Sequence, residues 1–358
     1  MSPRWRLRLS IGAVIGVIGC IVGLALDART MAASYLAAWV AVSAIAIGAI
    51  PVLFTTYFVR AGWTRDLFVP LSGAALSLPV VAVLFVPVLF SMTLIYPWAA
   101  HMENLPAFKG AYLTPWFFIL RTIVYFTIWI AIAVWGAVAY GDEIAMRRAG
   151  SVGLIVWALT ASWAGIDWIE SIEPHFHSSV YGLIVIAFDL LAGLSFAIAL
   201  LLIFRRRHSL DTASYSGVLL SAILLWAYLH AMQYIVIWAG NIPDEVTWYL
   251  RRMQGGWIVP LWVLFVAQSI APFFALLSGT VRSSRRGLLI IVAATLVLRY
   301  LEAIILVVPP LKVMNVLLLL DLPAAILVTG AVWLIGFDYA ARLVTNRGLD
   351  RAAPVHPQ

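Results

Sequence analysis

Long apolar runs, separated by short polar segments, fill most of this chain. About 20 consecutive apolar residues are needed to cross the roughly 30 Å hydrocarbon core of a bilayer. Ten runs are long enough, and they predict helices at 9–26, 33–59, 68–96, 111–139, 151–169, 178–204, 214–240, 255–279, 287–308 and 315–340. The run at 68–96 contains Pro70, Pro79 and Pro87, which predicts a kinked or interrupted helix. The pattern predicts an all-α polytopic membrane protein, with residues 1–358 forming a single membrane domain surrounded by lipid.

The first apolar run has a second interpretation. It follows Arg4, Arg6 and Arg8 and is followed by small residues, a pattern that also fits a cleaved signal peptide. Cleavage would leave nine helices and would change no other orientation.

Basic residues are distributed unevenly between the polar segments. With both termini on the inner side, sixteen of the 23 lysines and arginines lie in inner segments. The outer loops hold five, which are Arg29, Lys109, Arg251, Arg252 and Lys312. Two more, Arg121 and Arg299, lie inside helices. This positive-inside bias supports the helix count and predicts a multi-pass protein of a cytoplasmic membrane, with both termini in the cytoplasm.

Composition agrees with lipid as the solvent. Apolar residues make up 64% of the chain and charged residues 11%, whereas soluble domains are nearer about 45–50% and about 25%. Because the basic residues read as topology signals, the net charge of +7 does not predict a nucleic-acid partner. Cys20 is the only cysteine, so this chain alone cannot build a disulfide, an iron–sulfur cluster, a covalent c-type haem or a cysteine-based zinc site. A haem b between two histidines is not expected, since only His230 lies well inside a predicted helix.

Ionisable side chains inside the predicted helices are the candidates for chemistry. Each costs roughly 2.5–3.5 kcal/mol to insert at the bilayer centre, so each needs a partner, water or a function. They are Arg121, Asp189, His230, Arg299, Glu302 and Asp321.

Their depths follow from a rise of about 1.5 Å per helical residue. Arg121, Asp189 and His230 fall near the midplane, where Asp189 and His230 would meet as a proton relay. The other three fall nearer the outer face and would form a proton exit. The alternative is that the same groups only pin helices together.

Two stretches resemble a known family. Residues 167–182 resemble the pattern D-W-x-x-S-x-x-P-x-x-x-S-x-x-Y-G, and residues 233–252 resemble Q-Y-x-x-x-W-x-x-N-x-P-x-E-x-x-W-Y-x-x-R. The matching positions are Asp167, Trp168, Ser171, Pro174, Tyr181, Gly182, Gln233, Tyr234, Trp238, Asn241, Pro243, Glu245, Trp248 and Arg252. Both stretches are similar to the ActF subunit of alternative complex III, a bacterial quinol:cytochrome c oxidoreductase of the respiratory chain, within the NrfD-like superfamily.

The resemblance spans the third to the eighth predicted helix and implies two four-helix bundles plus peripheral helices. It implies that this chain has no redox centre, and that haem c and iron–sulfur clusters lie on partners: a homologous membrane subunit, an iron–sulfur protein and a multihaem cytochrome c. For this chain it implies quinone binding, proton translocation or both. Two alternatives remain open, an NrfD-like anchor of a polysulfide or other reductase, and a secondary transporter.

Overall fold

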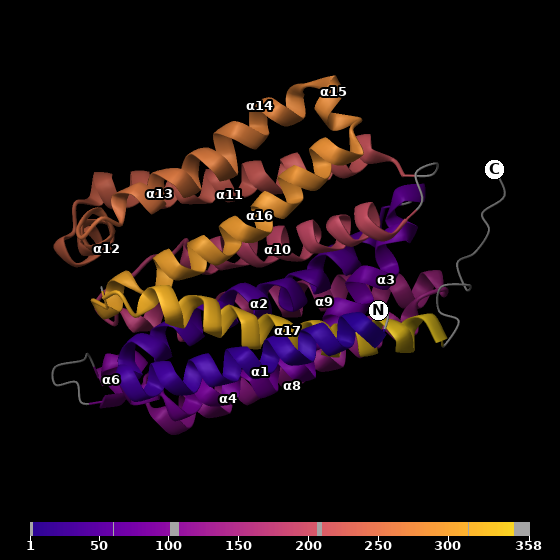
Figure 1. Ribbon diagram of the computed structural model, residues 1–358. Helices are drawn as coiled ribbons and strands as arrows, with labels where there is room; N and C mark the ends of the chain where they lie inside the picture. Colours follow the sequence, from indigo (N-terminus) through magenta and orange to yellow (C-terminus); the bar gives the residue numbers. More distant parts are fainter. Residues whose placement is uncertain (1–2, 60, 101–106, 206–209, 314, 347–358) are drawn as a thin grey trace.

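The computed structural model describes residues 3–59, 61–100, 107–205, 210–313 and 315–346 (Figure 1). Within these residues, ten helical segments are long and apolar enough to cross a bilayer, and no strand occurs. The predicted class, an all-α polytopic membrane protein, is therefore confirmed. Five arginines of the expected inner segments lie outside the described residues: Arg60, Arg206, Arg207, Arg347 and Arg351.

Eight of the spans consist mainly of one continuous helix. These helices are α1 (Pro3–Leu26), α2 (Ala28–Thr56), α8 (Pro115–Ala139), α9 (Glu143–Trp168), α10 (Tyr181–Phe204), α11 (Thr212–Gly240), α16 (Arg285–Val307) and α17 (Leu318–Asn346). The third span is divided into α3 (Gly62–Leu76) and α4 (Leu78–Phe90). The eighth is formed by α13 (Ile258–Phe265), a π-helical turn (Val266–Ile270) and α14 (Ala271–Leu277).

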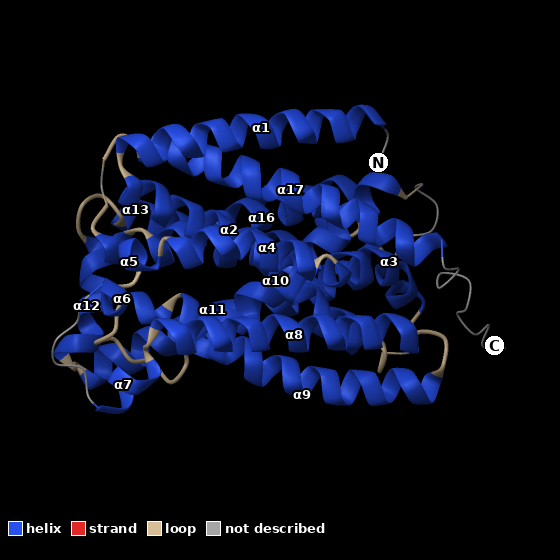
Figure 2. Cartoon of the chain, turned by 90° about the horizontal axis from the view of Figure 1, so that it is seen from below, coloured by secondary structure: helices blue, strands red, loops and turns tan. Residues whose placement is uncertain are grey.

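Short helices and turns connect the spans. They are α5 (Met92–Ile95), α6 (Pro97–Ala100), α7 (Ala107–Tyr112), α12 (Pro243–Met253), α15 (Gly279–Arg282) and the 3-10 turns Glu170–Ile172 and Pro309–Leu311. In both ribbon views, α1 begins and α17 ends at one end of the bundle, whereas α6 and α12 lie at the other (Figures 1 and 2).

The interruption expected in the third span is present. The break falls at Ser77, and Pro79, which has no backbone N–H, lies in the first turn of α4. The Ser77 hydroxyl donates to the carbonyl of Ala74 and accepts a hydrogen bond from the indole of Trp333 in α17, at 2.6 and 2.8 Å. The break in the eighth span was not expected. It comes just before Pro272, whose missing donor removes one bond of the α-helical ladder.

The spans gather into two groups around α2 and α10. The helices α3, α4, α8 and α9 pack around α2, whereas α11 and α16 pack around α10, with α14 against α11 and α13 against α16. The outlying α1 packs along α17. Besides α1, α17 also packs against α2 and α3, so it is not peripheral.

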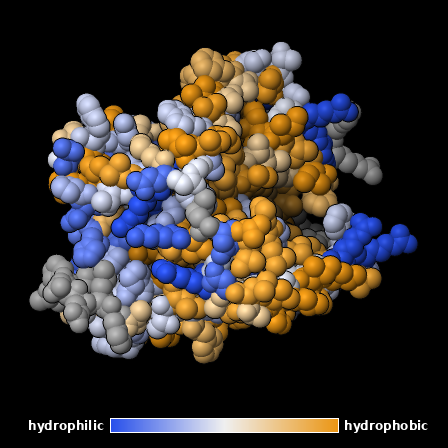
Figure 3. Space-filling view, turned by 60° about the vertical axis from the view of Figure 1, so that its left-hand side comes forward, coloured by the Kyte–Doolittle hydropathy of each residue, from blue (hydrophilic) through white to orange (hydrophobic). Residues whose placement is uncertain are grey.

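The two groups meet where α2 crosses α10. A methyl group on Gly193 would lie 2.4 Å from the backbone carbon of Gly48, so only glycines permit this approach. Small residues at such crossings are typical of membrane helices, because packing rather than the hydrophobic effect drives their association. The outer surface is apolar between two hydrophilic ends, as Figure 3 shows, which fits a lipid-facing belt.

Candidate functional site

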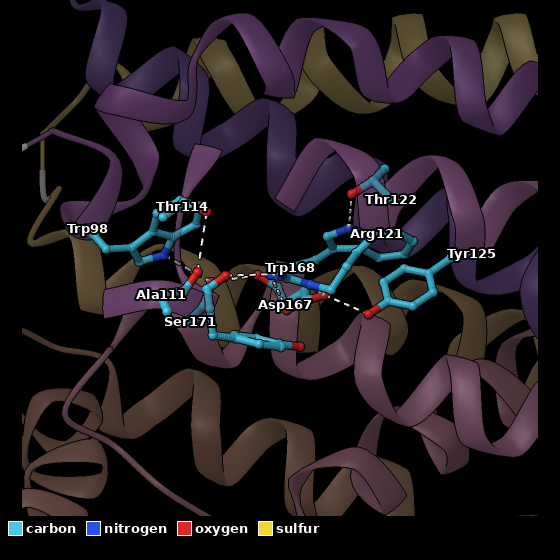
Figure 4. A network of polar contacts seen from close by, with 10 residues as sticks. Trp98, Ala111, Thr114, Arg121, Thr122, Tyr125, Asp167, Trp168 and Ser171 are labelled. Carbon is cyan, nitrogen blue, oxygen red and sulfur yellow. Dashed lines mark hydrogen bonds and ion pairs between the residues drawn. The ribbon is translucent and has the colours of Figure 1, made fainter. Parts of the chain in front are cut away.

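Arg121 lies in a closed polar network between α8 and α9 (Figure 4). Its Nε and Nη2 atoms donate to the Asp167 carboxylate at 2.8 and 3.0 Å, and Nη1 donates to the Tyr112 carbonyl at 2.9 Å. The Tyr125 hydroxyl donates to the same carboxylate at 2.7 Å. Every nitrogen of the guanidinium therefore has an acceptor. This arrangement fixes α8 against α9.

The rest of the first motif extends this network. The Trp168 indole donates to the Thr122 hydroxyl at 3.1 Å, and the Tyr96 hydroxyl donates to the Trp168 carbonyl at 3.0 Å. The Trp98 indole donates to the Ser171 hydroxyl at 3.3 Å. These contacts attach the outer end of α9 to α8 and to the segment around α6, so structure alone accounts for these motif positions.

The last positions of the first motif also have structural explanations. The carbonyl of Pro174 accepts a hydrogen bond from the Lys109 ammonium. Tyr181 is buried at the start of α10. A methyl group on Gly182 would lie 2.8 Å from Cβ of Ser162, so glycine permits α10 to approach α9 closely.

Arg252 of the second motif joins distant segments at the opposite end from the chain termini. Its Nε and Nη2 atoms donate to the carbonyls of Ile305 and Leu306, at 2.9 and 3.0 Å, near the end of α16. Its Nη1 atom donates to Glu173 at 3.1 Å, and Arg251 donates to the other oxygen of Glu173 at 2.6 Å. Burial lowers the pKa of the Arg252 guanidinium, whereas the Glu173 carboxylate acts in the opposite direction. The two motif regions are thus joined through Glu173.

Other residues of the second motif shape the turn from α11 into α12. Asn241 has a φ of 47° and ends α11, a left-handed conformation that asparagine tolerates. Pro243 and Glu245 occupy the first turn of α12, where proline loses no hydrogen bond and a carboxylate faces the positive end of the helix dipole. The Trp248 ring lies 3.7 Å from the Arg252 guanidinium.

A second polar cluster lies between α11 and α16. Nε2 of His230 lies 3.1 Å from Oε1 of Glu302, and Nδ1 of His230 lies 3.0 Å from the Trp226 carbonyl. The Trp226 indole donates to the same carboxylate at 3.0 Å. A carbonyl can only accept, so Nδ1 carries a hydrogen, and the Nε2–Oε1 contact needs one more proton on one of its two atoms. Two titratable groups therefore share an exchangeable proton.

Arg299 completes this cluster from the turn before Glu302. Nη1 of Arg299 forms an ion pair with Oε2 of Glu302. The arginine is 1% exposed, yet none of its side-chain nitrogens has a well-directed hydrogen bond within the described residues. The guanidinium lies 4.9 Å from the centre of the Trp226 ring. The cluster is therefore incompletely satisfied, unlike the network around Arg121.

A pocket of about 460 Å³ opens beside His230, between α11, α12 and α13. Aromatic side chains form much of its wall, and the imidazole lies among them. They are Trp226, Tyr234, Trp248, Tyr249, Trp262 and Phe265. Pockets of this size class commonly bind small organic molecules.

Two further motif residues of α11 are close in sequence to the residues of that helix that line the pocket. Gln233 is 2% exposed, and its side-chain oxygen has no partner within the described residues. Trp238 is 71% exposed at the end of α11, as expected of an interfacial aromatic residue.

The expected midplane relay is wrong in its pairings. His230 pairs with Glu302 rather than with Asp189, and Arg121 pairs with Asp167. The Asp189 carboxylate has no hydrogen bond or ion pair within the described residues, and it lines a separate cavity of about 20 Å³. Depth along a helix is one coordinate, and it does not tell which neighbouring helix a side chain faces.

The expected outer cluster forms only in part. Arg299 and Glu302 pair as predicted, but Asp321 faces α1, where a methyl group on Gly23 would lie 2.3 Å from its Oδ1. From the sequence, Asp167 stands out only as a motif position and not as the partner of Arg121, and Glu173 is not among the predicted site residues. Asp167 lies inside the predicted helix 151–169, so counting every acid within the helices would have found it.

Comparison with known proteins adds no assignment. No family model matches this chain, and no curated protein matches it. What the fold establishes is a helical, multi-pass membrane protein, and a more specific function depends on the geometry of the site.

Proposed function

We propose that this protein binds a quinol in the pocket beside His230 and accepts a quinol proton at the His230–Glu302 pair. The single observation that carries this proposal is the 3.1 Å contact between His230 and Glu302 at the wall of an aromatic pocket. A quinol is an apolar ring with hydroxyl groups. Aromatic walls stack on such a ring, and the imidazole bonds a quinol hydroxyl when Nε2 exchanges Glu302 for that hydroxyl.

Proton transfer follows from the arrangement of the pair. The pair first releases the proton of the Nε2–Oε1 contact to solvent. When the quinol O–H bond then breaks, its proton takes that place on the imidazole or on the carboxylate. Arg299 compensates the charge of Glu302 in the low dielectric of the protein. The electrons pass to a redox centre on a partner subunit, since this chain alone supplies no ligand set for haem c or an iron–sulfur cluster.

The sequence resemblance supports a specific assembly. We assign the chain to the membrane part of a quinol:cytochrome c oxidoreductase of the alternative complex III type, in a bacterial cytoplasmic membrane. Trp248 connects the resemblance with the pocket, because it belongs to the second motif and also lines the wall. An NrfD-like anchor of another reductase would use the same pocket with different partners.

A secondary transporter is the second candidate, and one observation favours it. The interrupted helices are the third and eighth spans, which correspond when the ten spans are divided into two halves of five. Broken helices at matching positions are typical of transporters built from repeats.

Purification of the tagged chain in mild detergent tests both candidates. The extract is analysed for c-type haem, non-haem iron and quinone. Co-purification of all three supports the respiratory assembly, and quinone with other redox partners supports a different reductase. A single chain without haem, iron or quinone contradicts the proposal and favours the transporter.

Quinone binding is tested separately on the purified protein. A short-chain quinone should quench tryptophan fluorescence at lower concentration in the wild type than in Trp262→Ala. Trp116→Ala is the matched control, because Trp116 is an exposed tryptophan of α8 that is not part of this pocket. Equal quenching in all three proteins would contradict binding in this pocket.

A further inference from the structure

A sulfur and oxygen ligand set converges where α1 meets α2 and α17. It consists of Cys20 of α1, Met31 of α2 and Asp321 of α17. We infer that these three side chains form a binding site for one monovalent copper ion, Cu(I). This site is separate from the pocket beside His230, and the inference does not depend on the proposed quinol binding.

Asp321 is the observation that points to a ligand. It is fully buried, and neither carboxylate oxygen has a hydrogen-bond partner within the described residues. The nearby hydroxyls of Tyr35 and Tyr300 donate elsewhere, to the carbonyls of Leu84 and Leu322. A buried carboxylate without a donor needs a proton or a cation.

The sulfur atoms lie beside this carboxylate. A methyl group on Gly23 would lie 2.3 Å from Oδ1 of Asp321 and 2.8 Å from Sδ of Met31, so both atoms converge on the same point of α1. Cys20 lies three residues before Gly23, on the same face of α1, and it packs against the cluster formed by Met31, Ala38 and Ala325.

The donor types select the ion. Thiolate and thioether ligands are soft and favour Cu(I), whereas zinc sites use histidine or several cysteines. The described residues contain no group of three or more histidine, cysteine, aspartate or glutamate side chains placed to bind a metal. Here one thiol, one carboxylate and a thioether act together.

The Asp321 carboxylate allows the site to remain neutral, because it can accept the proton of the Cys20 thiol. When Cu(I) binds, the Cys20 S–H bond breaks, a Cu–S bond forms and the proton moves to Asp321. The positive charge of the ion offsets the charge of the Cys20 thiolate, and Asp321 is neutral once it holds the proton, so the loaded site is neutral in an apolar environment. If Asp321 is already protonated, the thiol proton is released to solvent instead.

Copper binding is measured on the full-length protein in detergent, with Cu(I) supplied as its bicinchoninate complex. We expect one Cu(I) per chain in the wild type and at least tenfold weaker binding in Cys20→Ser. Met31→Leu and Asp321→Asn should also bind less tightly. Met232→Leu is the matched control, because Met232 is a methionine of α11 outside this site.

A second measurement uses the wild type alone, so a variant that fails to fold leaves the inference testable. Ag(I), a redox-stable mimic of Cu(I), should protect Cys20 from maleimide labelling in the solubilised protein. No retained copper in the wild type would overturn the inference. Copper retained equally by Cys20→Ser, or labelling that Ag(I) does not slow, would also overturn it.

Discussion

Arg121 and Arg299, two of the buried arginines that the structure describes, are paired in opposite ways. Arg121 has an acceptor for every nitrogen and lies in a network closed by Asp167 and Tyr125. Arg299 makes an ion pair with Glu302 but no well-directed hydrogen bond within the described residues. Glu302 is in turn shared with His230, which reaches the pocket.

The difference in hydrogen bonding indicates a structural role for the Arg121 network and a chemical role for the Arg299 cluster. A fully satisfied polar network is rigid and fixes one arrangement of helices, whereas a partly satisfied one has donors and acceptors left for a ligand. Both clusters contain an arginine and a carboxylate, so residue type alone does not distinguish them. The number of satisfied hydrogen bonds distinguishes the two clusters.

Breaking the Arg121 network should have the largest effect, and the effect should be on stability. Asp167→Asn leaves a buried guanidinium without its counter-charge, which costs about 3–5 kcal/mol in the free energy of unfolding. Denaturation by SDS in mixed micelles, followed by circular dichroism, measures this loss. The double variant Arg121→Met/Asp167→Leu should lose less, because no buried charge remains. A single variant as stable as the wild type would refute the closed-network interpretation.

Changing His230 should instead affect turnover. His230→Gln removes the titratable imidazole but retains polarity, and loss of a general base lowers quinol oxidation roughly 100-fold. Activity is measured on the intact assembly with a soluble quinol, and unfolding is measured in parallel. His177→Gln is the control, since His177 lies in the loop between α9 and α10 and contacts Lys109. If His230→Gln loses stability but retains turnover, the cluster around His230 has a structural role and not a chemical one.

The pocket wall should give a smaller effect, on quinol affinity. Trp262→Ala removes a stacking surface, and a loss of about 1.4 kcal/mol in binding corresponds to a tenfold rise in the quinol dissociation constant. Equilibrium titration of the purified protein measures it, with Trp116→Ala as the control. An unchanged dissociation constant would place the quinol elsewhere.

Removing the helix cap at Asp27 should give the smallest effect, a small loss of stability. Asp27 caps α2, and Asp27→Ala should cost about 1 kcal/mol in the free energy of unfolding at pH 7. The hydrogen bond from the Thr30 hydroxyl lowers the pKa of Asp27. Its contribution is therefore fully present above the unfolded pKa of about 3.9 and is lost as the pH falls through the lowered folded value. A variant whose stability differs from the wild type equally at pH 7 and at pH 2 would contradict this.

The sequence by itself determined the ten spans. Hydropathy is a property of each segment alone, and the bilayer sets the length that a segment needs. The break near Pro79 and the pairing of Arg299 with Glu302 were also predictable, because both depend on residues within one helix.

Only the tertiary structure decided which helices face one another. His230 and Asp189 have similar calculated depths, yet His230 faces Glu302 on α16, whereas Asp189 faces a cavity between α2, α8 and α9. Hydropathy fixes how deep a residue lies but not the rotation of its helix or the identity of its neighbours. Those follow from packing, such as the glycine contact of α2 with α10, which joins residues far apart in the chain.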